Sequence, residues 1–383
     1  MKRNYIAKRF QSAGSGLTLD TEALAKYKDI IDLSIGDTDF ITDEGIINAA
    51  FRDAKAGYTR YGDPKGDPEL IDAVCRAWQE DFEQKLPHDH VLVSASSCLG
   101  MALVMFSILD PGDEVIVFSP YFPMYRTQIE LAGGVCVDVP TYASEDYAID
   151  EARLRAAITP RTKAIIFNNP TNPTGMAYGN DTLEMLARVA KEYDLLIAAD
   201  EIYTTYLYEG DFRPLRTLPG MAERVITLNS FSKNFLMTGW RVGVIIAEPE
   251  LLEVMNDING SLIYTAPSIS QRAAIHALSM RREIREKYVT AYRDRIFYTA
   301  DRIEKIPYLS LVRPKGTFYL FPGIEKTGLT DDEFCNVLLD KAHVLVSHGK
   351  AFGTAGAGHF RIACTVGIDT LKIAFDRMEK LSF

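Results

Sequence analysis

The feature that most constrains the fold of this chain is an alternation of short apolar runs with longer, helix-like stretches. The apolar runs predict strands at residues 91–94, 114–118, 164–167, 195–199, 225–228 and 242–247. Helix-like segments, such as residues 101–109 and 182–193, lie between them. Continuous apolar strands that alternate with helices are typical of a parallel or mixed sheet covered on both faces. The sequence therefore predicts an α/β fold with a doubly wound sheet, whose ligands bind beyond the carboxyl ends of the strands.

The pattern changes after residue 278. A long charged helix is predicted at residues 281–303, followed by a β segment at residues 314–322 that is punctuated by Pro and Gly. Further helical and strand pieces continue from there. We expect a large domain at residues 46–278 and a smaller α+β domain built from residues 1–45 and 279–383. Because no low-complexity linker or internal repeat separates them, the small domain is expected to pack on the large one.

Composition and charge exclude several classes of partner. The chain has 383 residues and a formal net charge of -10, which argues against nucleic acid and anionic membranes. No stretch approaches the roughly 20 apolar residues that span a bilayer, and the first ten residues do not resemble a signal peptide. Five cysteines without CxxC spacing predict reduced thiols and a cytoplasmic location. The six histidines show no ligand spacing, so no metal is expected.

Two motifs follow directly after predicted strands. Residues 168–175 read Asn-Asn-Pro-Thr-Asn-Pro-Thr-Gly, and two Asn-Pro steps force an extended, turning backbone. An ordinary surface turn is the alternative interpretation. The second motif is Asp200-Glu-Ile-Tyr203. A carboxylate at the end of a buried strand is costly without a cationic or hydrogen-bonding partner, so Asp200 is expected to pair with a cationic ring nitrogen. The alternative is a helix N-cap.

Two further motifs follow the strand predicted at residues 225–228. Ser230-Phe-Ser-Lys233 places a lysine near the strand end, where a partly desolvated amine can act as a nucleophile. On its own, Lys233 would more simply be a surface lysine. Gly239-Trp-Arg-Val-Gly243 places Arg241 a short way downstream, and serine hydroxyls with a guanidinium suit a phosphate. The order of the four motifs and their shared position at strand ends predict one site.

With these motifs, the chain resembles the class I/II aminotransferases of the pyridoxal-phosphate fold type I superfamily, close to the aspartate and aromatic aminotransferases. The similarity runs from about residue 31 to about residue 377. It implies a fold type I transferase that uses pyridoxal 5'-phosphate (PLP). The expected reaction moves the amino group of an L-amino acid, such as aspartate or an aromatic amino acid, to a 2-oxo acid by a ping-pong mechanism.

The resemblance also implies roles for individual residues around the cofactor ring. Lys233 is expected to bind PLP covalently and then to shuttle a proton at the substrate Cα. Asp200 is expected to pair with the protonated ring nitrogen, which lets the ring accept electrons. Tyr203 and Asn172 are expected to hydrogen-bond the phenolic oxygen of the ring. Phe122 corresponds to the aromatic residue that stacks on the ring, although a core aromatic residue is the alternative.

The same resemblance implies a phosphate site that two subunits share. Ser230 and Arg241 are expected to bind the phosphate, together with Ser97 and Cys98 at the start of a helix, where backbone amides suit an anion. Serines 96 and 97 stand where the family usually has glycines. Tyr61 corresponds to a tyrosine that reaches the phosphate of the neighbouring subunit. The working unit is therefore expected to be a homodimer with shared active sites.

For the substrate, the resemblance points to Arg361, Gly36 and Asn172. Arg361 corresponds to the arginine that binds the α-carboxylate bidentately, with a buried structural arginine as the alternative. Gly36 corresponds to the glycine whose backbone approaches the same carboxylate. Lys350 could meet a second substrate carboxylate, but a solvated loop lysine is the simpler interpretation. His348 replaces a usual proline near the site.

Other functions stay open on the sequence. A PLP-dependent carbon–sulfur β-lyase acting on a cysteine-type substrate has the same fold and nearly the same motifs. A ligand-sensing module is a weaker alternative, because no basic helix-turn-helix precedes residue 31 and the net charge opposes DNA binding. A nicotinamide-binding protein is disfavoured, since no Gly-x-Gly-x-x-Gly follows the first predicted strand.

Overall fold

The structure is a computed structural model that describes residues 5, 7 and 27–383. Most of the first ten residues, in which no signal peptide was predicted, and much of the 1–45 segment lie outside the described residues. Within the described part of the chain, no helix is both long and apolar enough to cross a membrane.

The central element is a seven-stranded sheet with the strand order β2-β8-β7-β6-β5-β3-β4. Its strands are β2 (Val91–Ser94), β3 (Glu114–Ser119), β4 (Val135–Pro140), β5 (Thr162–Asn168), β6 (Leu196–Asp200), β7 (Val225–Ser230) and β8 (Gly243–Ile246). Strand β8 runs antiparallel to β2 and β7, and the other neighbouring pairs are parallel. The predicted mixed α/β sheet is confirmed.

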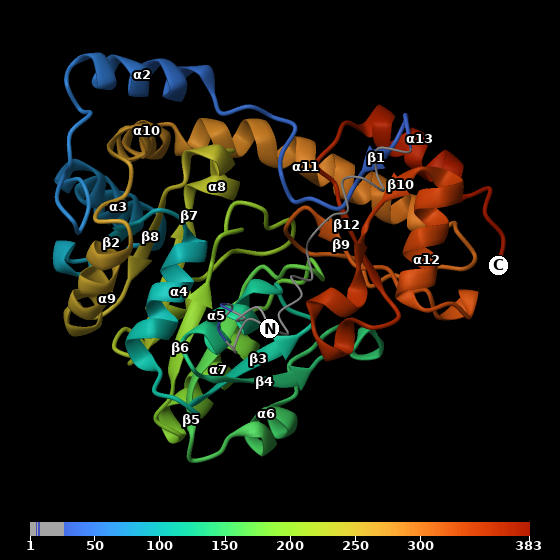
Figure 1. The fold of residues 1–383 in the computed structure, drawn as a ribbon, viewed down its shortest axis with the longest axis horizontal. Helices are drawn as coiled ribbons and strands as arrows, with labels where there is room; N and C mark the ends of the chain where they lie inside the picture. Colours follow the sequence, from blue (N-terminus) through green and yellow to red (C-terminus); the bar gives the residue numbers. More distant parts are fainter. Residues whose placement is uncertain (1–4, 6, 8–26) are drawn as a thin grey trace.

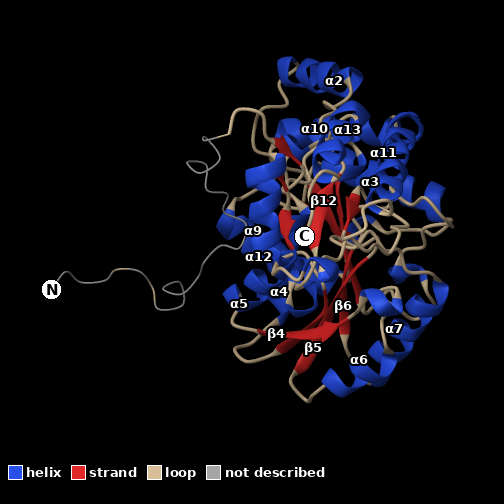
Figure 2. Ribbon diagram, turned by 90° about the vertical axis from the view of Figure 1, so that its right-hand side faces the viewer, coloured by secondary structure: helices blue, strands red, loops and turns tan. Residues whose placement is uncertain are grey.

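Successive residues of the central strands enter different hydrophobic clusters. In β3, Val115 and Val117 pack in the cluster that contains α4 (Ser97–Ile108) and α9 (Pro249–Leu262). Ile116 of the same strand packs in the cluster that contains α7 (Asn180–Glu192). Figure 2 shows α4, α5 and α9 on one side of the strands, with α6 and α7 on the other. The strands read as continuous apolar runs because helices cover both of their faces.

The remaining helices surround this sheet and a second, smaller group of strands (Figure 1). They are α2 (Glu44–Lys55), α3 (Pro68–Phe82), α5 (Met124–Leu131), α6 (Glu151–Ala157), α8 (Phe231–Asn234), α10 (Ser268–Ser279), α11 (Arg281–Ile303), α12 (Asp331–Val337) and α13 (Ile368–Met378). The predicted helix at residues 281–303 coincides with α11, and the six predicted strands are present with ends shifted by at most two residues.

Two local predictions differ from the structure. Strand β4 was not predicted, because it lies at the sheet edge and most of its residues are only partly buried. The β segment predicted at residues 314–322 is reduced to β9 (Tyr319–Leu320). Pro314 and Pro322 cannot donate ladder hydrogen bonds, and Thr317 has a φ of 60°, which interrupts an extended strand.

The smaller group of strands joins the two ends of the chain. Strand β1 (Ile31–Asp32) pairs with β10 (Val344–Leu345), and β11 (Ser347–His348) pairs with β12 (Phe360–Ala363), which also pairs with β9. Helix α11 connects two cores: Ile284 packs in a cluster with the central sheet, whereas Ile296 packs with the small strands. The division into domains at residues 45 and 278 stays a prediction.

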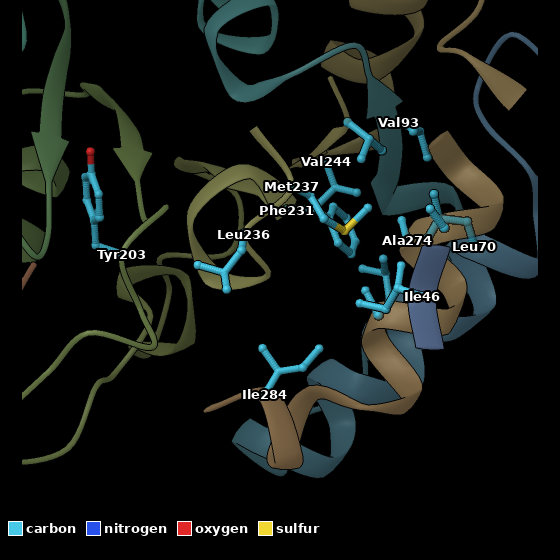
Figure 3. Close-up of a cluster of buried hydrophobic side chains, with 14 of the residues drawn as sticks. Ile46, Leu70, Val93, Tyr203, Phe231, Leu236, Met237, Val244, Ala274 and Ile284 are labelled. Carbon is cyan, nitrogen blue, oxygen red and sulfur yellow. The ribbon is translucent and has the colours of Figure 1, made fainter. Parts of the chain in front are cut away.

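A buried cluster fixes the short helix α8, which carries Lys233. Phe231, at the start of α8, is 3% exposed and shares this cluster with Met237 and Val244. Figure 3 shows these side chains close together and directed toward Leu70 and Ala274. Because α8 follows β7 without a gap, the position of Lys233 is set by the sheet and by this apolar contact.

Candidate active site

A cavity of about 770 Å³ lies at the carboxyl ends of β5, β6 and β7. Eleven of the twelve predicted site residues line it: Gly36, Ser97, Cys98, Phe122, Asn172, Asp200, Tyr203, Ser230, Lys233, Arg241 and Arg361. The exception is Tyr61, whose ring is 82% exposed and packs edge-on against Tyr264. The structure therefore brings most of the predicted residues together, while the roles assigned to them stay predictions.

Asp200, the last residue of β6, is a buried carboxylate with half of its hydrogen-bonding capacity unused. The Tyr125 hydroxyl donates to its Oδ2 atom. Its Oδ1 atom is buried and has no partner among the described residues. Burial raises the pKa of Asp200 to about 6. Residues 202–205 form a turn rather than a helix, so the N-cap alternative does not apply.

The Lys233 amine reaches across the cavity to the backbone of Gly36. Its Nζ donates to the Gly36 carbonyl oxygen at 2.5 Å. The helix that carries it is capped by Ser230, whose Oγ accepts from the Ser232 N–H at 3.1 Å. A Cβ at position 36 would lie 1.8 Å from the Tyr319 hydroxyl oxygen. Only glycine lets this backbone pass between Tyr319 and Lys233.

Tyr203 presents a buried phenol to the same space. Its hydroxyl donates to the Tyr319 hydroxyl at 3.3 Å, and its ring meets the Tyr319 ring edge-on. Burial raises the pKa of Tyr203 well above its usual value, so the hydroxyl keeps its proton at neutral pH. Tyr203 therefore has one proton to donate, which goes to Tyr319 here and reaches a ligand oxygen only when that hydrogen bond is exchanged.

Arg361, on β12, is a buried cation without a carboxylate partner in the described part of the chain. Its Nη1 donates to Asn172 Oδ1 at 3.0 Å, and its Nη2 donates to the Ser34 carbonyl oxygen and to Ser347 Oγ. The guanidinium carbon lies 4.5 Å from the Tyr319 ring centroid. Its Nε is buried and finds no acceptor among the described residues. A buried guanidinium in this state favours an anionic ligand.

The part of the cavity at the start of helix α4 suits a phosphate. Helix α4 begins at Ser97, and first-turn amides have no acceptor within their own helix. Gly243 lies so close that a Cβ there would be 2.8 Å from the Ser97 nitrogen. Arg241 also lines the cavity and donates to the Thr238 carbonyl oxygen at 2.8 Å. Ser96 has a φ of 135°, a conformation that favours the glycine usual in this position.

The structure adds cavity residues that the sequence did not predict. Tyr125 and Tyr319 contact Asp200 and Tyr203, and Ser347 contacts Arg361. No local motif marks them. Tyr125 and Asp200 are 75 residues apart, Tyr203 and Tyr319 are 116 residues apart, and Ser347 meets Arg361 only through the pairing of β11 with β12. Lys350 pairs with Asp332 and does not line the cavity, as the solvated-loop interpretation expects.

Comparison with known proteins identifies the family of this chain. Residues 28–378 match the family model of aminotransferase class I and II. The chain belongs to the aminotransferase class I and II family. This aminotransferase is 36% identical to the aspartate aminotransferase of Pyrococcus abyssi over 373 residues, which cover 93% of this chain and 92% of that protein.

Two further relatives show the range of activities among similar proteins. The arginine–pyruvate transaminase of Pseudomonas aeruginosa is 34% identical, with 93% of this chain and 91% of that protein covered. A single mutant of the Thermus thermophilus aspartate aminotransferase superposes with a TM-score of 0.93 at 32% identity, covering 99% of this chain and 100% of the other. The predicted family, the fold type I class and the amino-group transfer are confirmed. These comparisons give no support to the lyase alternative.

Proposed function

We propose that this aminotransferase uses PLP, bound covalently at Lys233, to move the amino group of an L-amino acid to a 2-oxo acid in two half-reactions. When bound, PLP supplies an electron-withdrawing ring that stabilises negative charge at the substrate Cα. The observation that carries the proposal is the buried, unpaired Oδ1 of Asp200, which has no partner in the described chain and lines the same cavity as Lys233.

The residues present fit this cofactor. Asp200 would accept a hydrogen bond from the protonated ring nitrogen, and the resulting ion pair would offset the cost of its burial. Tyr203 and Asn172 would hydrogen-bond the ring oxygen, and Phe122 would lie against the ring face. The phosphate would be bound by Ser97 and Cys98 at the start of α4, together with Ser230 and Arg241.

Lys233 would act twice. Its amine would hold the cofactor until the substrate amine takes that place. When its amine is free, Lys233 would act as a general acid and base that moves a proton between the substrate Cα and the cofactor. Its contact with the Gly36 carbonyl oxygen, at 2.5 Å, supports a position of the Lys233 amine between the strand ends and the substrate.

Arg361 would orient the substrate by binding its α-carboxylate through two N–H groups. Asn172 and Ser34 hold the guanidinium in place through Nη1 and Nη2. The backbone of Gly36 would approach the same substrate carboxylate. Fixing the substrate at this end sets the orientation of the Cα–H bond toward Lys233.

We further propose a cytoplasmic homodimer with shared active sites. The exposed Tyr61, paired with Tyr264, supports a role for this edge in a second subunit's phosphate site. All five cysteines are free thiols, which supports a reducing compartment. Light scattering of the purified protein tests the dimer: a monomer at working concentration would contradict it.

The function is tested by following the bound cofactor's absorption spectrum in single half-reactions. An amino acid alone should convert the cofactor to its amine form, and a 2-oxo acid should restore the original spectrum. No conversion with any amino acid would contradict transamination. Release of pyruvate and ammonia from a cysteine-type substrate, without any 2-oxo acid, would favour the β-lyase instead.

A further inference from the structure

The cavity has an apolar wall on the side of the small strands. We define this apolar wall by Ile35, Leu339, Leu345, Val346 and Ala351, all of which line the cavity. They come from both ends of the chain, which the β1–β10 pair brings together. No residue of the apolar wall carries a hydrogen-bonding side chain, whereas Asn336, Ser347 and His348 line the cavity from the same segments. The apolar wall itself offers a substrate contact area rather than a charge.

The apolar wall lies next to the groups proposed to hold the substrate. Arg361 donates to the Ser34 carbonyl oxygen and to Ser347 Oγ, which directly adjoin Ile35 and Val346 in the chain. Lys233 donates to the carbonyl oxygen of Gly36, the other neighbour of Ile35. A substrate whose carboxylate meets Arg361 and whose Cα faces Lys233 would therefore place its side chain along the apolar wall.

The charges of the cavity oppose a second substrate carboxylate. Among the described residues, four basic side chains line it: Lys233, Arg241, Arg361 and His348. The first three already have proposed roles: Lys233 at the cofactor and the substrate Cα, Arg241 at the phosphate and Arg361 at the α-carboxylate. His348 is a weak candidate for that role, because its Nδ1 lies 2.7 Å from Asp332 Oδ1, and the negative charge of Asp332 offsets that of a protonated imidazole.

A carboxylate also lines the cavity. It belongs to Asp37, which accepts a hydrogen bond from Thr238 Oγ1 at 2.8 Å and would repel a second substrate carboxylate. A carboxylate that leaves water without gaining a cationic partner is strongly disfavoured. The apolar wall and the charges of the cavity therefore both disfavour a substrate with a second carboxylate.

We infer that the amino donor of this enzyme is a monocarboxylic amino acid with a large apolar or aromatic side chain, and that aspartate and glutamate are poor donors. This inference rests on the proposed function. Burial against the apolar wall would lower the binding free energy with each methylene or ring added to the donor. The specificity-determining residues are then those of the apolar wall, with Asp37 acting against dicarboxylic donors.

The test measures the first half-reaction of the PLP-loaded enzyme, without any 2-oxo acid, for leucine, methionine, phenylalanine, aspartate and glutamate. The expected kcat/KM of the best apolar donor exceeds that of aspartate and glutamate by at least about 100-fold, the discrimination that an unpaired buried charge supports. The assay uses the whole enzyme, so a basic residue that a second copy of the chain supplied to the cavity would show itself as faster conversion by aspartate or glutamate. Equal or faster conversion by aspartate or glutamate would overturn the inference.

The same assay separates this inference from the proposed function. If no amino acid converts the cofactor, the proposed function falls and the inference falls with it. If aspartate converts the cofactor best, transamination stands and only the inference falls.

A variant tests where the donor side chain lies. Ile35 is 50% exposed, so a long polar side chain there avoids the core. Ile35→Arg should raise the ratio of aspartate to phenylalanine kcat/KM by at least about tenfold, whereas the neutral Ile35→Gln should not raise it. Leu339→Arg repeats the test from another segment. Arginine variants that bind PLP and keep the original ratio would contradict the inferred position.

Discussion

The two sides of the cavity are built in different ways. The floor lies at the carboxyl ends of β5, β6 and β7, which pair along registers of five and four residues. The opposite side depends on β1, β10 and β11, each only two residues long, and on segments from both chain ends. The groups proposed to bind the cofactor ring lie on the floor, and Arg361 and the apolar wall lie opposite. On the proposed roles, the sheet positions the groups that act with the cofactor, while the smaller strands set the choice of substrate.

The largest expected effect comes from the floor. In Asp200→Asn, the side chain keeps its shape but cannot stabilise a protonated ring nitrogen. We expect kcat to fall by at least about 1000-fold, comparable to the loss of a preorganised electrostatic group. Steady-state assays with the best donor check this, with PLP affinity measured alongside. A kcat within tenfold of the unchanged enzyme would contradict the role of Asp200.

The opposite side should respond differently. Arg361→Gln removes the charge proposed to bind the substrate carboxylate. We expect kcat/KM for the donor to fall by about 100-fold or more, because a buried charge pair loses one partner. The absorption spectrum and the affinity of the bound cofactor should not change. If PLP binding fell as much as kcat/KM, the separation of the two sides would be wrong.

The protein without cofactor should show the cost of the buried carboxylate. The pKa of Asp200 is raised to about 6 in the folded state, against about 3.9 when unfolded. Between these values the unfolded state has lost its proton and the folded state has not, so stability falls as pH rises from about 4 to 6. The change amounts to about 3 kcal/mol in total.

Denaturant unfolding of the cofactor-free enzyme and of Asp200→Asn, at several pH values, measures this dependence. The free energy of unfolding of the variant, relative to the original enzyme, should rise across this window. A difference between the two proteins that does not depend on pH would contradict the assignment to Asp200.

The smallest expected effect concerns Tyr125, which donates to Asp200 Oδ2. Tyr125→Phe leaves the carboxylate in place but removes one hydrogen bond to a charged group. We expect kcat to fall by about tenfold, with the pH dependence of kcat shifted. Tyr121→Phe is the matched control, because the Tyr121 hydroxyl donates to Asp138 instead. Equal losses in both variants would indicate a general packing defect.

The same comparison shows what could be predicted from the sequence. Strands buried on both faces read as apolar runs, so their positions were predicted to within two residues. Asp200 and Lys233 follow those strands directly, and their position at one edge of the sheet could be predicted from the fold class. On the opposite side, Arg361 and Gly36 were identified only through the family resemblance.

Other parts of the site were not predictable because their signals are not local. The apolar wall forms only when the short β1 pairs with β10, more than 300 residues away in the chain. Tyr125 is one of several polar residues on a short helix, and only the tertiary fold directs its hydroxyl to Asp200, 75 residues further along. Burial and long-range pairing, rather than motif, determine these positions.

The most direct test of the central claim is the covalent attachment of PLP to Lys233. The loaded enzyme is reduced with borohydride, digested and analysed by mass spectrometry. The peptide that contains Lys233 should carry the reduced cofactor, and Lys233→Ala should carry none while losing turnover. Modification of a different lysine, or normal turnover by Lys233→Ala, would contradict the account.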